Sequence, residues 1–158
     1  MAVRANLIDR VWRWGLRVAY WGQLGWWRVW HPRLTGAAVA VWHEGRVLVI
    51  RNSYRRALTL PAGGLKRRED HRAAAARELR EEVGIDVPAE TLRYVGEFLE
   101  ITRYADDHLY LYELRCPQAP EVCVDGREVV WARFLTPAEA LEGGATGVFG
   151  SYLRGLAA

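Results

Sequence analysis

The chain has 158 residues, of which 51% are hydrophobic and 26% charged, which is the composition of an ordinary folded domain rather than of a disordered or collagen-like chain. Its two cysteines, Cys116 and Cys123, are too few for a disulfide scaffold. The net charge of +3 is unevenly distributed, because residues 1–33 carry six arginines against Asp9 and the remainder is slightly acidic. We therefore expect no nucleic-acid partner.

Residues 1–33 form a segment rich in tryptophan and arginine, and we place a domain boundary between it and residues 34–158. The spacing predicts one or two amphipathic helices over 3–30, with six tryptophans between Trp12 and Trp30 and with arginines gathered on another face. The segment is too charged to span a bilayer, and this composition is typical of helices in a membrane interface. We expect either peripheral contact with the inner face of the membrane, in a cytoplasmic protein, or packing on its own domain or in a homodimer.

The remaining chain predicts a mixed α/β domain, because strand and helix patterns alternate without repeats. The clearest helix covers residues 70–83, with Asp70 as its N-cap and Gly84 as its C-cap. Glu44-Gly45 predicts a hairpin turn, and Pro61–Gly64 predicts another turn. Strands are predicted at 35–42, 46–50, 92–101, 108–115 and 129–135, with a hairpin tip at 104–107 and further helices from Pro137 and near Val148.

Three carboxylates are predicted to share one face of the helix at 70–83. Glu78, Glu81 and Glu82 stand at positions i, i+3 and i+4, which places them within about 6 Å of one another on a helix. A hard divalent cation with oxygen ligands, above all Mg²⁺, would relieve their mutual repulsion. The alternative is a solvated acidic face whose charge is balanced by Arg77 and Arg80.

The spacing around these glutamates resembles the signature of the Nudix hydrolases over residues 63–85. The matching positions are Gly63, Glu69, Arg77-Glu78-Leu79, Glu81-Glu82 and Gly84-Ile85. The resemblance implies an α/β/α sandwich with a mixed sheet, to which the N-terminal helical segment is added. It also implies a hydrolase that depends on Mg²⁺, with Mn²⁺ as an alternative, and cleaves a pyrophosphate bond in a nucleoside diphosphate linked to another group.

The resemblance further implies a role for each matching residue. Glu78, Glu81 and Glu82 correspond to metal ligands, Arg77 to the arginine that orients a catalytic glutamate, and Glu69 to a supporting residue. We assign catalytic roles to Glu81, Arg77 and Glu128, a carboxylate outside the signature, and substrate contacts to Gly63, Gly64 and Lys66. If Glu128 does not serve, the reserves are Glu121, Glu100 and Asp107.

A second function class stays open beside the hydrolase. Lys66-Arg67-Arg68 stands where many members of the family have an acidic residue and a glycine, which weakens any substrate assignment by analogy. The alternative function is a nucleotide-binding module without catalysis, tethered to a membrane or a partner by its N-terminal helix. A missing glutamate in the signature would favour that module, and none is missing.

Overall fold

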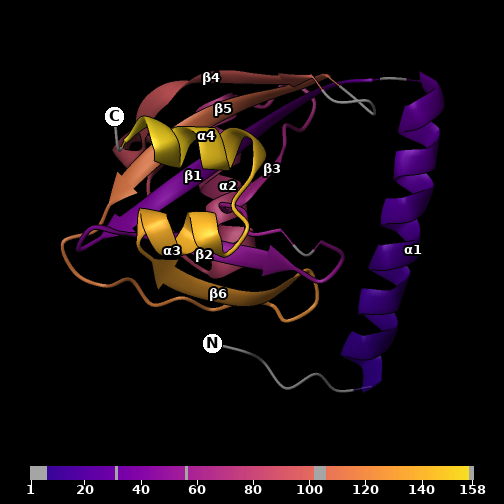
Figure 1. The fold of residues 1–158 in the computed structure, drawn as a ribbon, viewed down its shortest axis with the longest axis horizontal. Helices are drawn as coiled ribbons and strands as arrows, with labels where there is room; N and C mark the ends of the chain where they lie inside the picture. Colours follow the sequence, from indigo (N-terminus) through magenta and orange to yellow (C-terminus); the bar gives the residue numbers. More distant parts are fainter. Residues whose placement is uncertain (1–6, 31, 56, 102–105, 157–158) are drawn as a thin grey trace.

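The computed structural model describes residues 7–30, 32–55, 57–101 and 106–156. Figure 1 shows a long helix, α1 (Leu7–Trp30), standing beside a layered domain. The elements of that domain are, in chain order, β1 (Arg33–His43), β2 (Arg46–Asn52), β3 (Ala62–Gly64), α2 (His71–Val83), the short 3-10 helix η1 (Ala89–Thr91), β4 (Arg93–Ile101), β5 (Asp106–Arg115), β6 (Val129–Leu135), α3 (Pro137–Glu142) and α4 (Gly147–Gly155).

The sheet is mixed and has the strand order β4-β5-β1-β2-β6. β1 and β5 are parallel along their length, whereas the other pairs are antiparallel. β1 and β2 are joined at Glu44 and Gly45, whose φ angles of 47° and 73° are those of a tight hairpin turn. β3 pairs with β1 beside this path and joins Gly36 to Gly64 in register.

Two hydrophobic cores lie on opposite faces of this sheet. On one face α2 buries Ala74, Ala75, Leu79 and Val83 against the strands. On the other face α3 and α4 bury a second set that consists of Ala140, Phe149, Tyr152 and Leu153. Strand side chains alternate between the two faces, so each core receives every second residue of β1. The expected α/β/α sandwich with an additional N-terminal helix is therefore confirmed.

The structure differs from the sequence expectation at one place. Residues 62–64, predicted as part of a turn, form the strand β3, because their backbone finds partners on β1 that sequence pattern does not reveal. Of the one or two helices expected in the N-terminal segment, the structure shows one continuous helix from Leu7 to Trp30, whose three glycines each cost a helix only about 1 kcal/mol. The predicted hairpin tip falls partly on residues 102–105, which lie outside the described residues.

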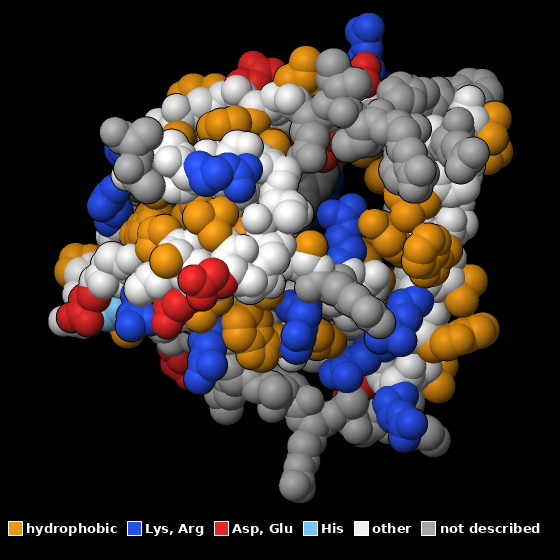
Figure 2. Space-filling model, in the orientation of Figure 1, with side chains coloured by type: hydrophobic (Ala, Val, Ile, Leu, Met, Phe, Trp, Pro, Cys, Tyr) orange, Lys and Arg blue, Asp and Glu red, His pale blue; other side chains and the backbone are white. Residues whose placement is uncertain are grey.

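The helix α1 has two different faces. A row at spacings of three and four turns toward the domain and is half-buried; it consists of Asp9, Arg13, Leu16, Tyr20, Leu24 and Trp27. The outer face is apolar and exposed, with Trp14 and Trp21 each 69% accessible. Figure 2 shows basic side chains gathered between α1 and the domain, and hydrophobic ones on the far side of the helix. Among the described helices, none is both long and apolar enough to cross a bilayer.

Candidate functional site

The helix α2 sets the position of the three signature glutamates. Its first turn is capped by the Asp70 carboxylate, which accepts hydrogen bonds from the backbone N–H groups of Arg72 and Ala73 at 2.9 and 3.2 Å. Its last turn ends at Gly84, whose φ of 73° favours glycine. The small and aliphatic side chains of α2 bury one face against β1, which leaves the polar face toward β3 and the loop before α2.

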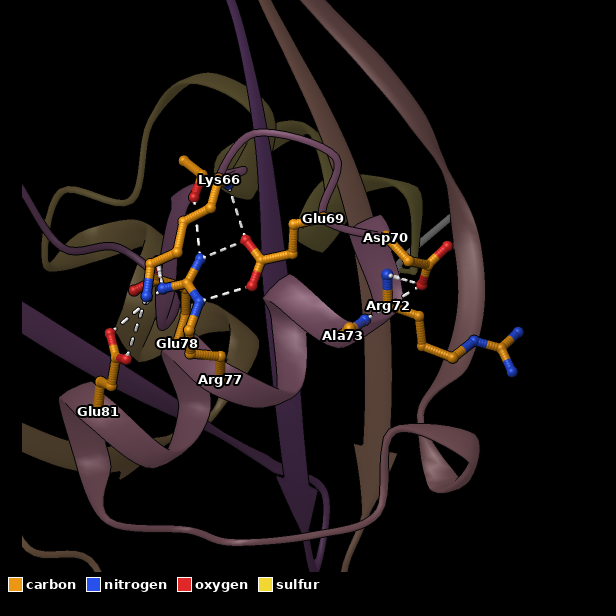
Figure 3. Close-up of polar contacts among 9 residues, drawn as sticks. Lys66, Glu69, Asp70, Arg72, Ala73, Arg77, Glu78 and Glu81 are labelled. Atoms are coloured by element: carbon orange, nitrogen blue, oxygen red, sulfur yellow. Dashed lines mark hydrogen bonds and ion pairs between the residues drawn. The ribbon is translucent and has the colours of Figure 1, made fainter.

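Arg77 is the centre of an ionic network on this polar face (Figure 3). Its guanidinium donates to both carboxylate oxygens of Glu69 at 2.8 and 2.9 Å, and to Glu78 and Glu81 at 2.5 and 3.2 Å. It also donates to the carbonyl of Gly64 at 3.0 Å. The hydrogen bonds from Arg77 lower the pKa of Glu69 to about 2, so this carboxylate stays charged and anchors the arginine. Arg77 thereby links the loop before α2 to the glutamates on α2.

Lys66 lies at the edge of the same network. Its Nζ is 3.8 Å from an Oε of Glu81, and its backbone N–H donates to Glu69 at 2.8 Å. Two residues later Arg68 adopts a φ of 63°, an uncommon conformation for a residue with a Cβ. The basic loop therefore turns Lys66 toward the carboxylates of α2.

Gly63 lies directly beneath the carboxylate of Glu78. A Cβ at Gly63 would stand 2.1 Å from that carboxyl group, which no pair of atoms tolerates, whereas a Cβ at Gly64 would meet nothing closer than the Thr35 carbonyl at 4.0 Å. The two adjacent glycines therefore have different roles. Gly63 makes room for Glu78, and Gly64 supplies a carbonyl to Arg77.

Glu82 is the buried carboxylate of the site. Its side chain is 7% exposed and accepts a hydrogen bond from the N–H of Ala62 on β3 at 2.8 Å. Burial raises its pKa to about 8, against the effect of that hydrogen bond, and the charges of Glu78, Glu128 and Asp125 raise it further. Burial likewise raises the pKa of Glu78, although Arg77 opposes it. The two carboxylates are thus held close together in a site that disfavours their negative charge.

Glu128 joins this cluster from the loop before β6. Asp125 fixes the loop by accepting hydrogen bonds from the backbone N–H groups of residues 127, 128 and 129. The Glu128 carboxylate accepts a hydrogen bond from the hydroxyl of Tyr54 at 2.9 Å, and its charge acts on Glu78 and Glu82. Of the reserves, Glu121 lies exposed in the preceding loop, Asp107 pairs in register with residue 100 on β4, and the side chain of Glu100 lies outside the described residues.

The donor set suits a hard divalent cation. The charge of Glu128 raises the pKa of both Glu78 and Glu82, and that of Glu78 raises the pKa of Glu82 further, so a cation beside these two carboxylates would favour their charged forms. Within the described ranges, no group of three or more His, Cys, Asp or Glu side chains is placed to hold a metal ion. Figure 3 shows that Glu78 and Glu81 both accept hydrogen bonds from Arg77.

The cleft beside these carboxylates has a wall that the sequence analysis did not predict. A cavity of about 640 Å³ is lined by Gly63 and Gly64 on one side and by Gln23 and Trp27 of α1 on the other. A smaller cavity of about 270 Å³ lies between α1 and Glu128. The amphipathic pattern of α1 predicts a face that packs, but no local signal indicates that this face borders the site.

Comparisons with known proteins agree with this architecture. The NUDIX domain profile matches residues 32–152. A methanol dehydrogenase activator from Bacillus methanolicus is 33% identical over 87 residues, which cover 52% of this chain and 45% of that protein. The aligned segment thus spans less than half the length of that relative.

Three solved structures share the fold at low identity. A MutT NUDIX hydrolase from Burkholderia pseudomallei has a TM-score of 0.68 at 20% identity, covering 78% of this chain and 97% of its own. The dihydroneopterin triphosphate pyrophosphohydrolase of E. coli has a TM-score of 0.65 at 20% identity, covering 79% and 95%. The NUDIX domain of Shewanella oneidensis NrtR, complexed with ADP ribose, has a TM-score of 0.65 at 13% identity, covering 77% and 84%. With its profile match across most of its length, the chain belongs to the NUDIX domain family.

Proposed function

We propose that this chain is a Mg²⁺-dependent hydrolase that cleaves a pyrophosphate bond in a nucleoside diphosphate linked to another group. The observation that supports it best is the carboxylate cluster of Glu78, Glu82 and Glu128, gathered from α2 and the loop before β6. Family membership and the names of two structural relatives, a triphosphate pyrophosphohydrolase and a domain complexed with ADP ribose, support the same substrate class.

Each residue of the site has a definite part in this proposal. Glu78, Glu81 and Glu82 hold Mg²⁺, or Mn²⁺ in its place, which when bound polarises phosphoryl oxygens and lowers the pKa of water. Arg77 orients Glu78 and Glu81 by the hydrogen bonds it donates to both. Glu128 accepts a proton from the attacking water, and the exposed Glu81 carboxylate assists in positioning that water.

Substrate contacts fall on the loop before α2. The exposed Lys66 ammonium lies 3.8 Å from a carboxylate oxygen of Glu81. It can therefore pair with a substrate phosphate that binds beside Glu81. Gly63 and Gly64 border the cavity of about 640 Å³, so a phosphate in this cavity can lie against the backbone of the two glycines.

The decisive test is the Glu82→Gln variant, assayed with Mg²⁺ on a panel of nucleoside triphosphates, nucleotide sugars, dinucleoside polyphosphates and ADP-ribose. Removing the charge while keeping the volume should abolish turnover, and the amide oxygen can still accept from Ala62. Glu142→Gln, on α3, serves as the control and should match wild type. Normal turnover in folded Glu82→Gln would contradict the metal assignment, and Mg²⁺-independent nucleotide binding without turnover by wild type would favour the binding module.

A second activity is favoured by the exposed face of α1. We propose that this face contacts the surface of an anionic bilayer, at the inner side of the membrane. Trp14 and Trp21 point away from the domain, and tryptophan prefers the headgroup region. The exposed Arg10 adds a charge that attracts anionic lipid.

Flotation with vesicles that contain phosphatidylserine tests this contact. Wild type should float at low salt and less at high salt, because part of the attraction is screened. Trp14→Ser with Trp21→Ser should abolish flotation, whereas Leu99→Ser, which removes an exposed leucine on β4, should not. A wild-type protein that stays at the bottom of the gradient, or a salt-insensitive dimer lost in the tryptophan variant, would overturn the membrane contact.

A further inference from the structure

A cavity of about 590 Å³ between α1 and the end of β2 is lined by four arginines. Arg13 and Arg17 come from α1, and Arg51 and Arg55 come from β2 and the loop that follows it. Among the described residues that line it, none is acidic. The helix α1 lies outside the segment that matches the NUDIX profile, so half of this arginine set is an addition of this chain to the domain.

The four guanidinium groups are held by neutral partners. Arg13 donates to the carbonyl of Gly126 at 2.9 and 2.6 Å, and Arg17 donates to the carbonyl of Ser53 at 3.0 Å. Arg55 donates to the Tyr20 hydroxyl at 3.1 Å, and the Arg51 guanidinium lies 5.6 Å from the centre of the Trp131 ring. These hydrogen bonds and ring contacts to uncharged groups hold the arginines in place beside the cavity.

One buried hydroxyl beside the same cavity, that of Ser53, points to an anionic ligand. Asn52 and Ser53 are each 8% exposed and line the cavity together with the arginines. The Asn52 Oδ1 and the Ser53 Oγ find no hydrogen-bond partner among the described residues. Buried polar groups in folded proteins are nearly always paired, so a hydroxyl donor left unpaired among cations suggests that a bound anion completes the site.

We propose that this cavity binds a phosphate group of a ligand. Guanidinium groups match phosphate oxygens with paired N–H donors, and the Ser53 hydroxyl adds a neutral donor. Tyr54 lines this cavity and also the one that contains Glu128, so the two sites adjoin. The phosphate belongs either to the part of a substrate that lies beyond the scissile bond or to a lipid headgroup next to the outer face of α1. Only the first source rests on the proposed hydrolase function.

Calorimetric titration of the full-length protein with pyrophosphate, in EDTA and at constant ionic strength, tests the site. Arg17→Gln with Arg51→Gln should weaken binding at least about tenfold, since two charge-assisted contacts are lost. The control, Arg133→Gln with Arg154→Gln, removes the same charge from exposed positions outside the cavity and should stay within about twofold of wild type. Equal affinities in all three proteins, or equal losses in both variants, would overturn the proposal.

Ser53→Ala supplies a test that leaves every charge in place. It should weaken pyrophosphate binding by about threefold to tenfold without lowering the unfolding temperature, because the hydroxyl has no hydrogen-bond partner to lose among the residues that the structure describes. An unchanged affinity in Ser53→Ala would exclude the hydroxyl from the site and contradict the proposal. The Glu82→Gln protein should bind pyrophosphate as wild type does, so this outcome is independent of turnover.

Two further titrations distinguish the sources of the phosphate. If a nucleoside diphosphate binds more weakly to the arginine variant while phosphatidic acid vesicles bind it unchanged, the substrate supplies the phosphate. If vesicle binding falls and nucleotide binding is unchanged, a lipid headgroup supplies it. Either pattern supports phosphate recognition. If neither nucleotide binding nor vesicle binding falls in the arginine variant, the proposal is overturned.

Discussion

The hydroxyl of Tyr54 donates a hydrogen bond to the carboxylate of Glu128 at 2.9 Å and connects the loop after β2 to the loop before β6. The Asn52 side chain donates to the same hydroxyl at 3.0 Å, so the hydroxyl proton is directed toward Glu128. Burial is the main reason that the pKa of Tyr54 is raised to about 12, so the hydroxyl stays protonated at neutral pH. The ring of Tyr54 also contacts Tyr20 of α1, with centroids 5.0 Å apart.

Tyr54→Phe should lower kcat by about tenfold with little change in KM, since it removes a hydrogen bond of about 1.4 kcal/mol that positions Glu128. Tyr20→Phe removes the neighbouring hydroxyl on α1 and should leave kcat unchanged. Steady-state kinetics on both variants provide the measurement. A Tyr54→Phe enzyme with wild-type kcat would show that Glu128 needs no help from this hydroxyl.

Glu128→Gln should lower kcat by about 100- to 10,000-fold, which is the usual contribution of a general base. Metal affinity, measured by Mn²⁺ titration, should change little, because Glu78 and Glu82 remain. The control is Glu121→Gln, an exposed carboxylate of the same loop region. A loss below about threefold in Glu128→Gln would move the role to Glu121, Glu100 or Asp107.

Gly63→Ala should disable the site, whereas Gly64→Ala should be tolerated. The added methyl at Gly63 collides with the Glu78 carboxyl at 2.1 Å, which must move away from its place above β3, but the same methyl at Gly64 finds open space. We expect Mn²⁺ affinity and turnover to fall at least about tenfold in the first variant only. Comparable losses in both variants would show that any added side chain in β3 disturbs the site, and that the space which Gly63 leaves for Glu78 is not the cause.

Protonation of Glu113 should make the protein less stable in acid. Its buried carboxylate accepts hydrogen bonds from Tyr152 at 2.6 Å and Arg93 at 2.5 Å. Burial raises its pKa, but these hydrogen bonds and the charges of Arg93 and Arg115 outweigh burial and hold the pKa below its ordinary value. The stabilisation is therefore complete above the ordinary carboxyl pKa and is lost as the pH falls through the lowered value.

Urea unfolding at pH 7 and at pH 3 measures this contribution. Glu113→Gln should cost about 2 kcal/mol of unfolding free energy at pH 7 and clearly less at pH 3. Glu90→Gln, at an exposed position in η1, should change neither value. The same loss for Glu113→Gln at both pH values would mean that the negative charge of Glu113 does not contribute to the stability of this part of the core.

The sequence predicted the parts of the fold that depend on neighbours along the chain. Asp70 and Gly84 are local signals, and they bound α2 as expected. Apolar, β-branched runs bounded by turn residues placed most of the strands correctly, because a strand that is buried on both faces of a sheet carries such continuous runs. The strand β3 was missed because a segment of three residues carries no periodicity. Its hydrogen-bond partners on β1 lie 24 to 28 positions earlier in the chain.

The site was predicted less completely than the fold. The helical spacing predicted that Glu78, Glu81 and Glu82 share one face of α2, and the structure shows how Arg77 holds two of them. The contact between Tyr54 and Glu128 joins residues 74 positions apart, so no local pattern could reveal it. The place of α1 at the cleft likewise depends on tertiary contacts of its arginines.

The contacts of α1 also have a consequence for how the chain is made. Arg13 bonds to Gly126, a residue 113 positions later, and Asp9 pairs with Arg127, 118 positions later. A ribosome adds residues at about 5–20 per second, so the partners of Asp9 and Arg13 emerge several seconds after these two residues. During that interval both its faces, including the tryptophans, are open to chaperones or to a nearby lipid surface. The N-terminal half of α1 can therefore dock completely only after nearly the whole chain has been made.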